Sequence, residues 1–142
     1  MSAKIQAALG YLLGALFVYA GMTKALDPAR FFADIRNYDI LPWPAVAVML
    51  AFYLPWLEIL CGVAVIIRPL RAGALLLLTT LLLAFTAALA QAWVRGLDIS
   101  CGCFGKADDH PGGYLLWIGR DAGLLIVALW LTIAEARRER TR

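Results

Sequence analysis

Two cysteines separated by a single glycine stand in a short polar stretch between two long apolar runs. Cys101 and Cys103 could form a disulfide only within a very small ring, and Gly102 relaxes the backbone limits on that ring. A strained, exposed disulfide is oxidising and labile, which suits exchange better than scaffolding. Lys106 lies close in sequence and would favour the nucleophilic thiolate. The spacing therefore favours thiol–disulfide chemistry.

Short cysteine pairs also bind metals. Cys101 and Cys103, together with His110 and either Asp108 or Asp109, could supply ligands for zinc or copper. The only histidine of the chain lies in a stretch that looks like a flexible turn, so we predict no metal here. A purely structural pair remains the other alternative.

The composition places these residues at a membrane. Hydrophobic residues make up 63% of the chain, against about 45–50% in soluble domains. A core formed by 142 residues could not bury that much apolar surface, so the lipid bilayer must cover it. We predict an all-α integral membrane four-helix bundle. The basic tail indicates a membrane anchor and not a nucleic-acid site.

Four apolar stretches are long enough to cross a hydrocarbon core of about 30 Å at about 1.5 Å per residue. A single membrane domain then comprises spans at 5–23, 45–67, 72–94 and 114–134, an interfacial helix at 28–38, the cysteine loop at 95–113 and the basic tail at 135–142. Small residues in the first span would allow another helix to approach closely. These residues are Gly10, Gly14 and Gly21.

The interfacial helix is predicted from its cap and its periodicity. Asp27 is a standard N-cap residue, and Pro28 suits the first helical turn. Apolar residues then recur at helical spacing with charged residues between them, which is typical of an amphipathic helix. The apolar set is Phe31, Phe32, Ile35 and Tyr38, and the charged set is Arg30, Asp34 and Arg36. An ordinary loop is the alternative.

Three charged residues fall inside predicted spans. Glu58 should face the bundle interior with a partner or a proton, and Pro55 should bend the helix beside it. Its role could be a proton relay, a headgroup contact or a structural pair. Arg120 and Asp121 should also face the bundle. Glu58 is a candidate partner for Arg120, despite a depth mismatch of roughly 10 Å. Alternatively, Arg120 faces the cysteine loop and stabilises a thiolate.

The cations predict an orientation. Four spans place both termini on one side, and Arg68, Arg71 and the basic tail favour that side as cytoplasmic. The cysteine loop is then extracytoplasmic, where disulfides persist, and the membrane is the inner (cytoplasmic) one. Cys61 would lie roughly 24 Å below the outer surface. That is too far for a bond to the loop, because bridged Cα atoms lie within about 7 Å, so Cys61 should be a packing residue.

Three motifs resemble a known family. The stretches are Phe17-Val18-Tyr19-Ala20-Gly21-Met22-Thr23-Lys24 with Asp27-Pro28, Leu54-Pro55-Trp56-Leu57-Glu58 with Gly62, and Asp98-Ile99-Ser100-Cys101-Gly102-Cys103-Phe104-Gly105 with Arg120-Asp121. The first two resemble DoxX-like membrane proteins. The third looks like their MauE branch, the methylamine utilisation proteins. This resemblance covers nearly the whole chain.

The resemblance implies a four-helix membrane protein linked to redox or disulfide metabolism. MauE is linked to maturation of a disulfide-rich subunit, and relatives often accompany thioredoxin-like proteins. The family's redox pair falls on Cys101 and Cys103. Its acidic and basic helix positions fall on Glu58, Lys24, Arg120 and Asp121. Methylamine metabolism itself does not follow for this chain.

We therefore expect exchange of a Cys101–Cys103 disulfide with an extracytoplasmic thioredoxin-like partner or a disulfide-containing client. A partner thiolate would attack one sulfur, and the other cysteine would resolve the mixed disulfide. A sustained oxidase would need an electron acceptor such as a membrane quinone. A reductant conduit would need a donor on the other face, where only Cys61 lies. The alternative is a non-enzymatic small transporter, metal carrier or assembly subunit.

Overall fold

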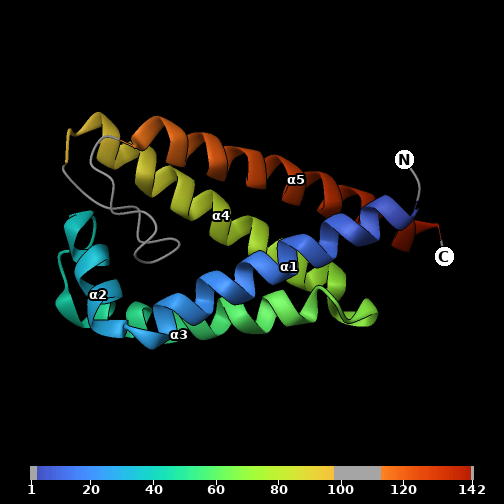
Figure 1. The fold of residues 1–142 in the computed structure, drawn as a ribbon, viewed down its shortest axis with the longest axis horizontal. Coiled ribbons are helices and arrows are strands. Elements are labelled where there is room, and N and C mark those ends of the chain that lie inside the picture. Colours follow the sequence, from blue (N-terminus) through green and yellow to red (C-terminus); the bar gives the residue numbers. More distant parts are fainter. Residues whose placement is uncertain (1–2, 98–112, 142) are drawn as a thin grey trace.

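The fold consists of helices and the short connections between them (Figure 1). The computed structural model describes residues 3–97 and 113–141. Within these ranges there is no strand, and the elements are α1 (Ala3–Leu26), α2 (Pro28–Asn37), α3 (Pro44–Ala64), the 3-10 helix η1 (Arg68–Leu70), α4 (Arg71–Val94) and α5 (Tyr114–Arg140). The prediction of an all-α fold is confirmed.

Four of the helices, α1, α3, α4 and α5, are long and apolar enough to cross a membrane. They alternate in direction, so that the start of α1 and the end of α5 lie at one end of the bundle. The short helix α2 lies at the opposite end, where α4 ends and α5 begins (Figure 1). Many large apolar side chains are exposed on the outer surface, including Leu12, Phe52, Leu60, Leu76 and Ile126. Lipid is the medium that suits this surface, and the protein is a multi-pass membrane protein.

Two helices continue beyond the predicted spans. Helix α1 extends to Leu26 and so includes Lys24, whose charge led us to end the span at residue 23. This charge has a buried partner in α3 and does not require the helix to stop. Helix α5 extends through the basic tail to Arg140. Its last turn carries cations, which interact favourably with the negative end of the helix dipole.

Helices α1 and α3 pack closely along small residues. A Cβ atom added at Gly14 would lie 2.6 Å from the carbonyl oxygen of Gly62, and one added at Gly62 would lie 2.7 Å from the carbonyl oxygen of Gly14. Nearer α2, a Cβ atom at Gly21 would lie 2.7 Å from the carbonyl oxygen of Pro55. Gly14 and Gly21, two of the three glycines predicted to permit close approach, therefore do so, and they fix how α1 lies on α3.

The apolar core lies toward the end of the bundle that holds the termini. Cys61 is 5% exposed and belongs to a buried cluster with Leu13, Leu75, Leu78 and Leu131. Among the described residues it is a free thiol. The prediction that Cys61 is a packing residue is confirmed.

Helix α2 begins as predicted and packs against α3. The backbone N–H of Arg30 donates to Oδ1 of Asp27 at 3.1 Å, and Pro28 occupies the first turn. Phe31 is buried, but so is Asp34, which we had placed among the polar residues of this helix. Asp34 lies three residues after Phe31 and therefore shares its face of the helix.

Arg71, which we had counted among the cations of the cytoplasmic side, is also buried. Its Nη2 donates to the backbone carbonyl of Gln6 at 2.9 Å. The guanidinium lies against Gly10, where a Cβ atom would collide with it. The absence of a side chain at residue 10 thus makes room for Arg71, and this contact joins α1 to the start of α4.

The α1–α3 contact predicts that a single methyl group at residue 14 is destabilising. Gly14→Ala would place Cβ against the Gly62 carbonyl, and such overpacking costs about 1–3 kcal/mol. Gly123→Ala is the matched control, since a Cβ atom at Gly123 meets nothing within 4 Å. Thermal unfolding in detergent should show a lower midpoint for Gly14→Ala alone. Equal midpoints in the two variants would contradict this packing.

Candidate functional site

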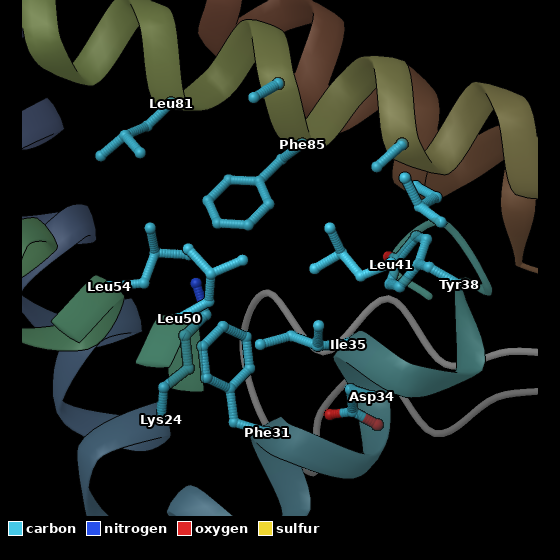
Figure 2. A pocket seen from close by; sticks show the side chains of 13 residues that line it. Lys24, Phe31, Asp34, Ile35, Tyr38, Leu41, Leu50, Leu54, Leu81 and Phe85 are labelled. Carbon is cyan, nitrogen blue, oxygen red and sulfur yellow. The ribbon is translucent and has the colours of Figure 1, made fainter. Parts of the chain in front are cut away.

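A cavity of about 280 Å³ lies at the α2 end of the bundle (Figure 2). Helix α2 and the segment after it form one wall, and α3 and α4 form the others. The lining side chains are largely apolar and include Phe31, Ile35, Leu41, Leu50, Leu54, Leu81 and Phe85. Lys24 and Asp34 bring charged groups to this lining.

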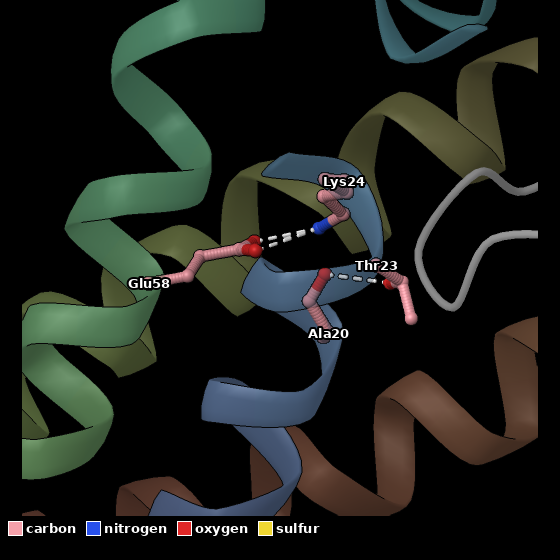
Figure 3. Close-up of polar contacts among 4 residues, drawn as sticks. All are labelled: Ala20, Thr23, Lys24 and Glu58. Atoms are coloured by element: carbon pink, nitrogen blue, oxygen red, sulfur yellow. Dashed lines mark hydrogen bonds and ion pairs between the residues drawn. The ribbon is translucent and has the colours of Figure 1, made fainter. Parts of the chain in front are cut away.

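A buried ion pair adjoins this cavity (Figure 3). Nζ of Lys24 lies 2.7 Å from Oε1 and 2.9 Å from Oε2 of Glu58. The two side chains are 3% and 1% exposed. Either charge alone would be strongly unfavourable at this depth, so each side chain can be buried there only because it pairs with the other.

The helix packing explains why the pair forms. Gly21 meets α3 at Pro55 and Ile59, and Lys24 lies one turn beyond Gly21 on the same helix. Glu58 lies one turn beyond Pro55, with its side chain toward α1. The close contact at Gly21 therefore brings the ammonium and the carboxylate together.

Two aromatic rings complete the surroundings of the ammonium. Nζ of Lys24 lies 5.2 Å from the ring centroid of Phe31 and 4.6 Å from that of Phe85. At these distances the ring faces attract a cation, and the attraction is stronger where water is excluded. Phe31 comes from α2 and Phe85 from α4, so Lys24 connects helices that otherwise line opposite walls of the cavity.

Asp121 places a second acid beside the pair. It is buried, and its Oδ1 accepts a hydrogen bond from Nε of Arg120 at 3.2 Å. Lys24, Glu58 and Asp121 line one small cavity of about 20 Å³. A space of this size holds about one water molecule. Such a water could connect the two carboxylates.

The structure decides between the predicted partners of Glu58. Its burial in the bundle interior is confirmed, and Lys24 holds it instead of Arg120. We had left Lys24 outside the first span, which hid this pairing. Asp34 and Phe85 also line the cavity, and neither was predicted as a site residue. Asp34 could have been found from its spacing to Phe31, but no pattern in the uniformly apolar α4 distinguishes Phe85.

The predicted cysteine site lies outside the described residues, as do Lys106, Asp108, Asp109 and His110. Helix α4, which leads into this segment, ends next to the residues that follow α2. Arg95 donates from Nη2 to Oδ2 of Asp39 at 2.9 Å and from Nη1 to the Asp39 carbonyl at 3.1 Å. Within residues 3–97 and 113–141, no group of three or more His, Cys, Asp or Glu side chains is placed so that it could hold a metal ion.

The fold and the site define a small multi-pass helical membrane protein with a buried ion pair beside an apolar cavity. A family model described as methylamine utilisation protein MauE matches residues 2–134. The chain therefore belongs to the MauE family.

Two curated relatives carry the same name. The methylamine utilization protein MauE of Paracoccus denitrificans is 37% identical over 128 residues, which cover 89% of this chain and 67% of the relative. Its counterpart from Methylophilus methylotrophus is 35% identical over 85 residues, which cover 59% of this chain and 44% of the relative. The chain thus spans only part of each relative. No solved structure matches it.

The ion pair predicts strong coupling between Lys24 and Glu58. Lys24→Met and Glu58→Leu should each cost about 3–5 kcal/mol of stability, because each leaves a buried group without its partner. The double variant should recover most of that loss, since it removes both charges. Unfolding of all three proteins in detergent measures the coupling. A double variant less stable than both single variants would contradict the pairing.

Proposed function

We propose that this chain is a membrane thiol–disulfide exchange protein, in which Cys101 and Cys103 form the redox pair. Its partner is an extracytoplasmic thioredoxin-like protein or a disulfide-containing client. The observation that carries this proposal is the Cys-Gly-Cys spacing in the segment that joins α4 to α5. A strained pair of this kind suits transfer of a disulfide.

The arrangement of the helices supports this placement. Arg95 holds the end of α4 against the segment between α2 and α3, so the chain departs toward the cysteines at the α2 end. Lys24 lies in the last turn of α1, the end of that helix that leads into α2, and it lines a small cavity together with Glu58 and Asp121. A redox segment here would be attached to a framework that holds ionisable groups in fixed positions.

The exchange itself conserves electrons and atoms. A thiolate of the partner attacks one sulfur of the Cys101–Cys103 disulfide, and the other sulfur leaves as a thiolate. A second thiolate of the partner then attacks the partner's own sulfur in the mixed disulfide, which releases the partner with a new disulfide and leaves Cys101 and Cys103 as two thiols. In the reverse direction, one cysteine of the pair attacks a disulfide of the partner and the other cysteine resolves the mixed disulfide. Lys106 would stabilise the thiolate that leaves.

We further propose the cytoplasmic membrane as the location, with both termini cytoplasmic. The described arginines Arg68, Arg137, Arg138 and Arg140 lie at the end of the bundle that holds the termini. Cations of this kind favour the cytoplasmic side. The family name makes a disulfide-bearing protein of methylamine utilisation a candidate client.

The redox pair predicts a reversible two-electron couple. Thiol alkylation and mass spectrometry of the detergent-purified protein across a glutathione series should show Cys101 and Cys103 oxidised and reduced together, at an oxidising potential. Cys61→Ser should leave this potential unchanged, since Cys61 lies in the apolar core. Two thiols that never pair, or that are protected by bound zinc or copper, would instead indicate a metal carrier.

The resolving step predicts a trapped intermediate. Cys103→Ser should either accumulate mixed disulfides with the partner or lose exchange, because no second thiol remains to release it. Non-reducing gels with a thioredoxin-like protein test this, with Cys61→Ser as the control for thiol loss. Normal exchange in both Cys101→Ser and Cys103→Ser would exclude the mechanism. Copurification with a large partner without exchange would favour an assembly subunit.

The orientation predicts which thiols can be labelled from outside. In a Cys61→Ser background, a membrane-impermeant maleimide should label reduced Cys101 and Cys103 in intact spheroplasts. A cysteine placed at the exposed Thr141 should be labelled only after the membrane is opened. Labelling of Thr141→Cys in intact spheroplasts would reverse the proposed orientation.

A further inference from the structure

We infer that the cavity beside Lys24 binds the ring of a membrane quinone. This inference rests on the proposed function, because the quinone would accept the electrons that the cysteine pair releases. The described residues that line the cavity come from α1, α2, α3, α4 and the segment after α2. Substitutions at these positions test the inference without altering the cysteines.

The Lys24 ammonium supplies a hydrogen-bond donor to this cavity. Its two bonds to Glu58 use at most two of its three N–H groups. The side chain is 3% exposed, and its nitrogen points in among the cavity side chains (Figure 2). No acceptor from the described residues takes the remaining N–H, which instead faces the rings of Phe31 and Phe85. A ligand with an acceptor oxygen would satisfy it.

The charges of the lining favour a neutral ligand. Glu58 already neutralises Lys24, which is the only cation among the described lining residues. A fatty acid or a phosphate headgroup would bring a further negative charge into this apolar space. A carbonyl oxygen can accept the hydrogen bond without adding a charge. This distinguishes a quinone from an anionic lipid.

The shape of the cavity favours a flat ring with an apolar tail. Phe31 and Phe85 project into it from opposite walls, and such ring faces stack on a planar ligand (Figure 2). Its volume of about 280 Å³ is close to the lower end for ligand pockets, about 300 Å³. The space thus suits a ring alone. The cavity is partly open, and the exposed Ala84 on its α4 wall marks a route by which the tail could reach lipid.

A quinone also completes the redox reaction. When two cysteine thiols join as a disulfide, they give up two electrons and two protons. A quinone takes up two electrons and two protons and becomes a hydroquinone. Cys61 cannot replace this acceptor, because it is a lone thiol packed in the apolar core.

The test is binding of a benzoquinone with a decyl tail to the full-length protein in lipid nanodiscs, measured by equilibrium dialysis. Wild type should bind it saturably. Ala88→Phe fills the cavity and should weaken binding by about tenfold or more, whereas Ala87→Phe, on the exposed side of the same helix, should change it by less than about twofold. The Lys24→Met/Glu58→Leu variant, which loses the donor without leaving a buried charge, should weaken binding by about tenfold.

A second measurement guards against misfolded variants. An azido-substituted quinone should cross-link wild-type peptides from α2 or α4, and excess decyl benzoquinone should prevent this. Absent or unsaturable binding, equal effects of Ala88→Phe and Ala87→Phe, or equal competition by dodecanoic acid would overturn the inference.

The two proposals can fail separately. The Cys101→Ser/Cys103→Ser protein should still bind the quinone. If wild type binds the quinone but shows no thiol exchange, the proposed function is wrong and the quinone site is supported. If wild type exchanges thiols but does not bind the quinone, the quinone site is wrong and the proposed function is supported.

Discussion

The buried pair of Lys24 and Glu58 is the interaction on which the site depends. Lipid offers no water to a charge, so each group is stable at its depth only because the other lies within hydrogen-bonding distance. The pair can form only if α1 and α3 approach closely, and Gly21 makes this possible. The close packing of α1 on α3 at its small residues and the burial of the charged pair are therefore parts of the same constraint.

This constraint divides the bundle into two unlike ends. Toward the termini, the core around Leu75 and Cys61 is filled by apolar side chains, and Gly14 and Gly62 pack backbone against backbone. Toward α2, the Lys24 side chain occupies the space between α1, α3 and α4, and a cavity remains beside it. A helix bundle that must enclose a charged pair cannot also be packed there as tightly as a uniform apolar core. The cavity follows from the same residues that hold the helices together.

Much of this fold could be predicted from the sequence, because lipid restricts a chain so strongly. Uncharged runs give the spans, and the Asp27–Pro28 cap gives the start of α2. What could not be predicted is which charges meet. The prediction that Glu58 faces the bundle interior is confirmed, but we had ended the first span before Lys24, so Arg120 appeared to be the available partner. Pairing across helices depends on their packing contacts, here at Gly21, and one sequence does not reveal these.

The neutrality of the site bears on the chemistry proposed for it. Thiol oxidation by a quinone moves electrons and protons together, so an apolar site can host it only if protons have somewhere to go without leaving a bare charge in lipid. Glu58 is held by Lys24 and shares a water-sized space with Asp121, which is paired with Arg120. The Lys24–Glu58 pair alone does not require this second acid. In the redox reaction that we propose, Asp121 would supply a second carboxylate beside Glu58 to which a proton could pass.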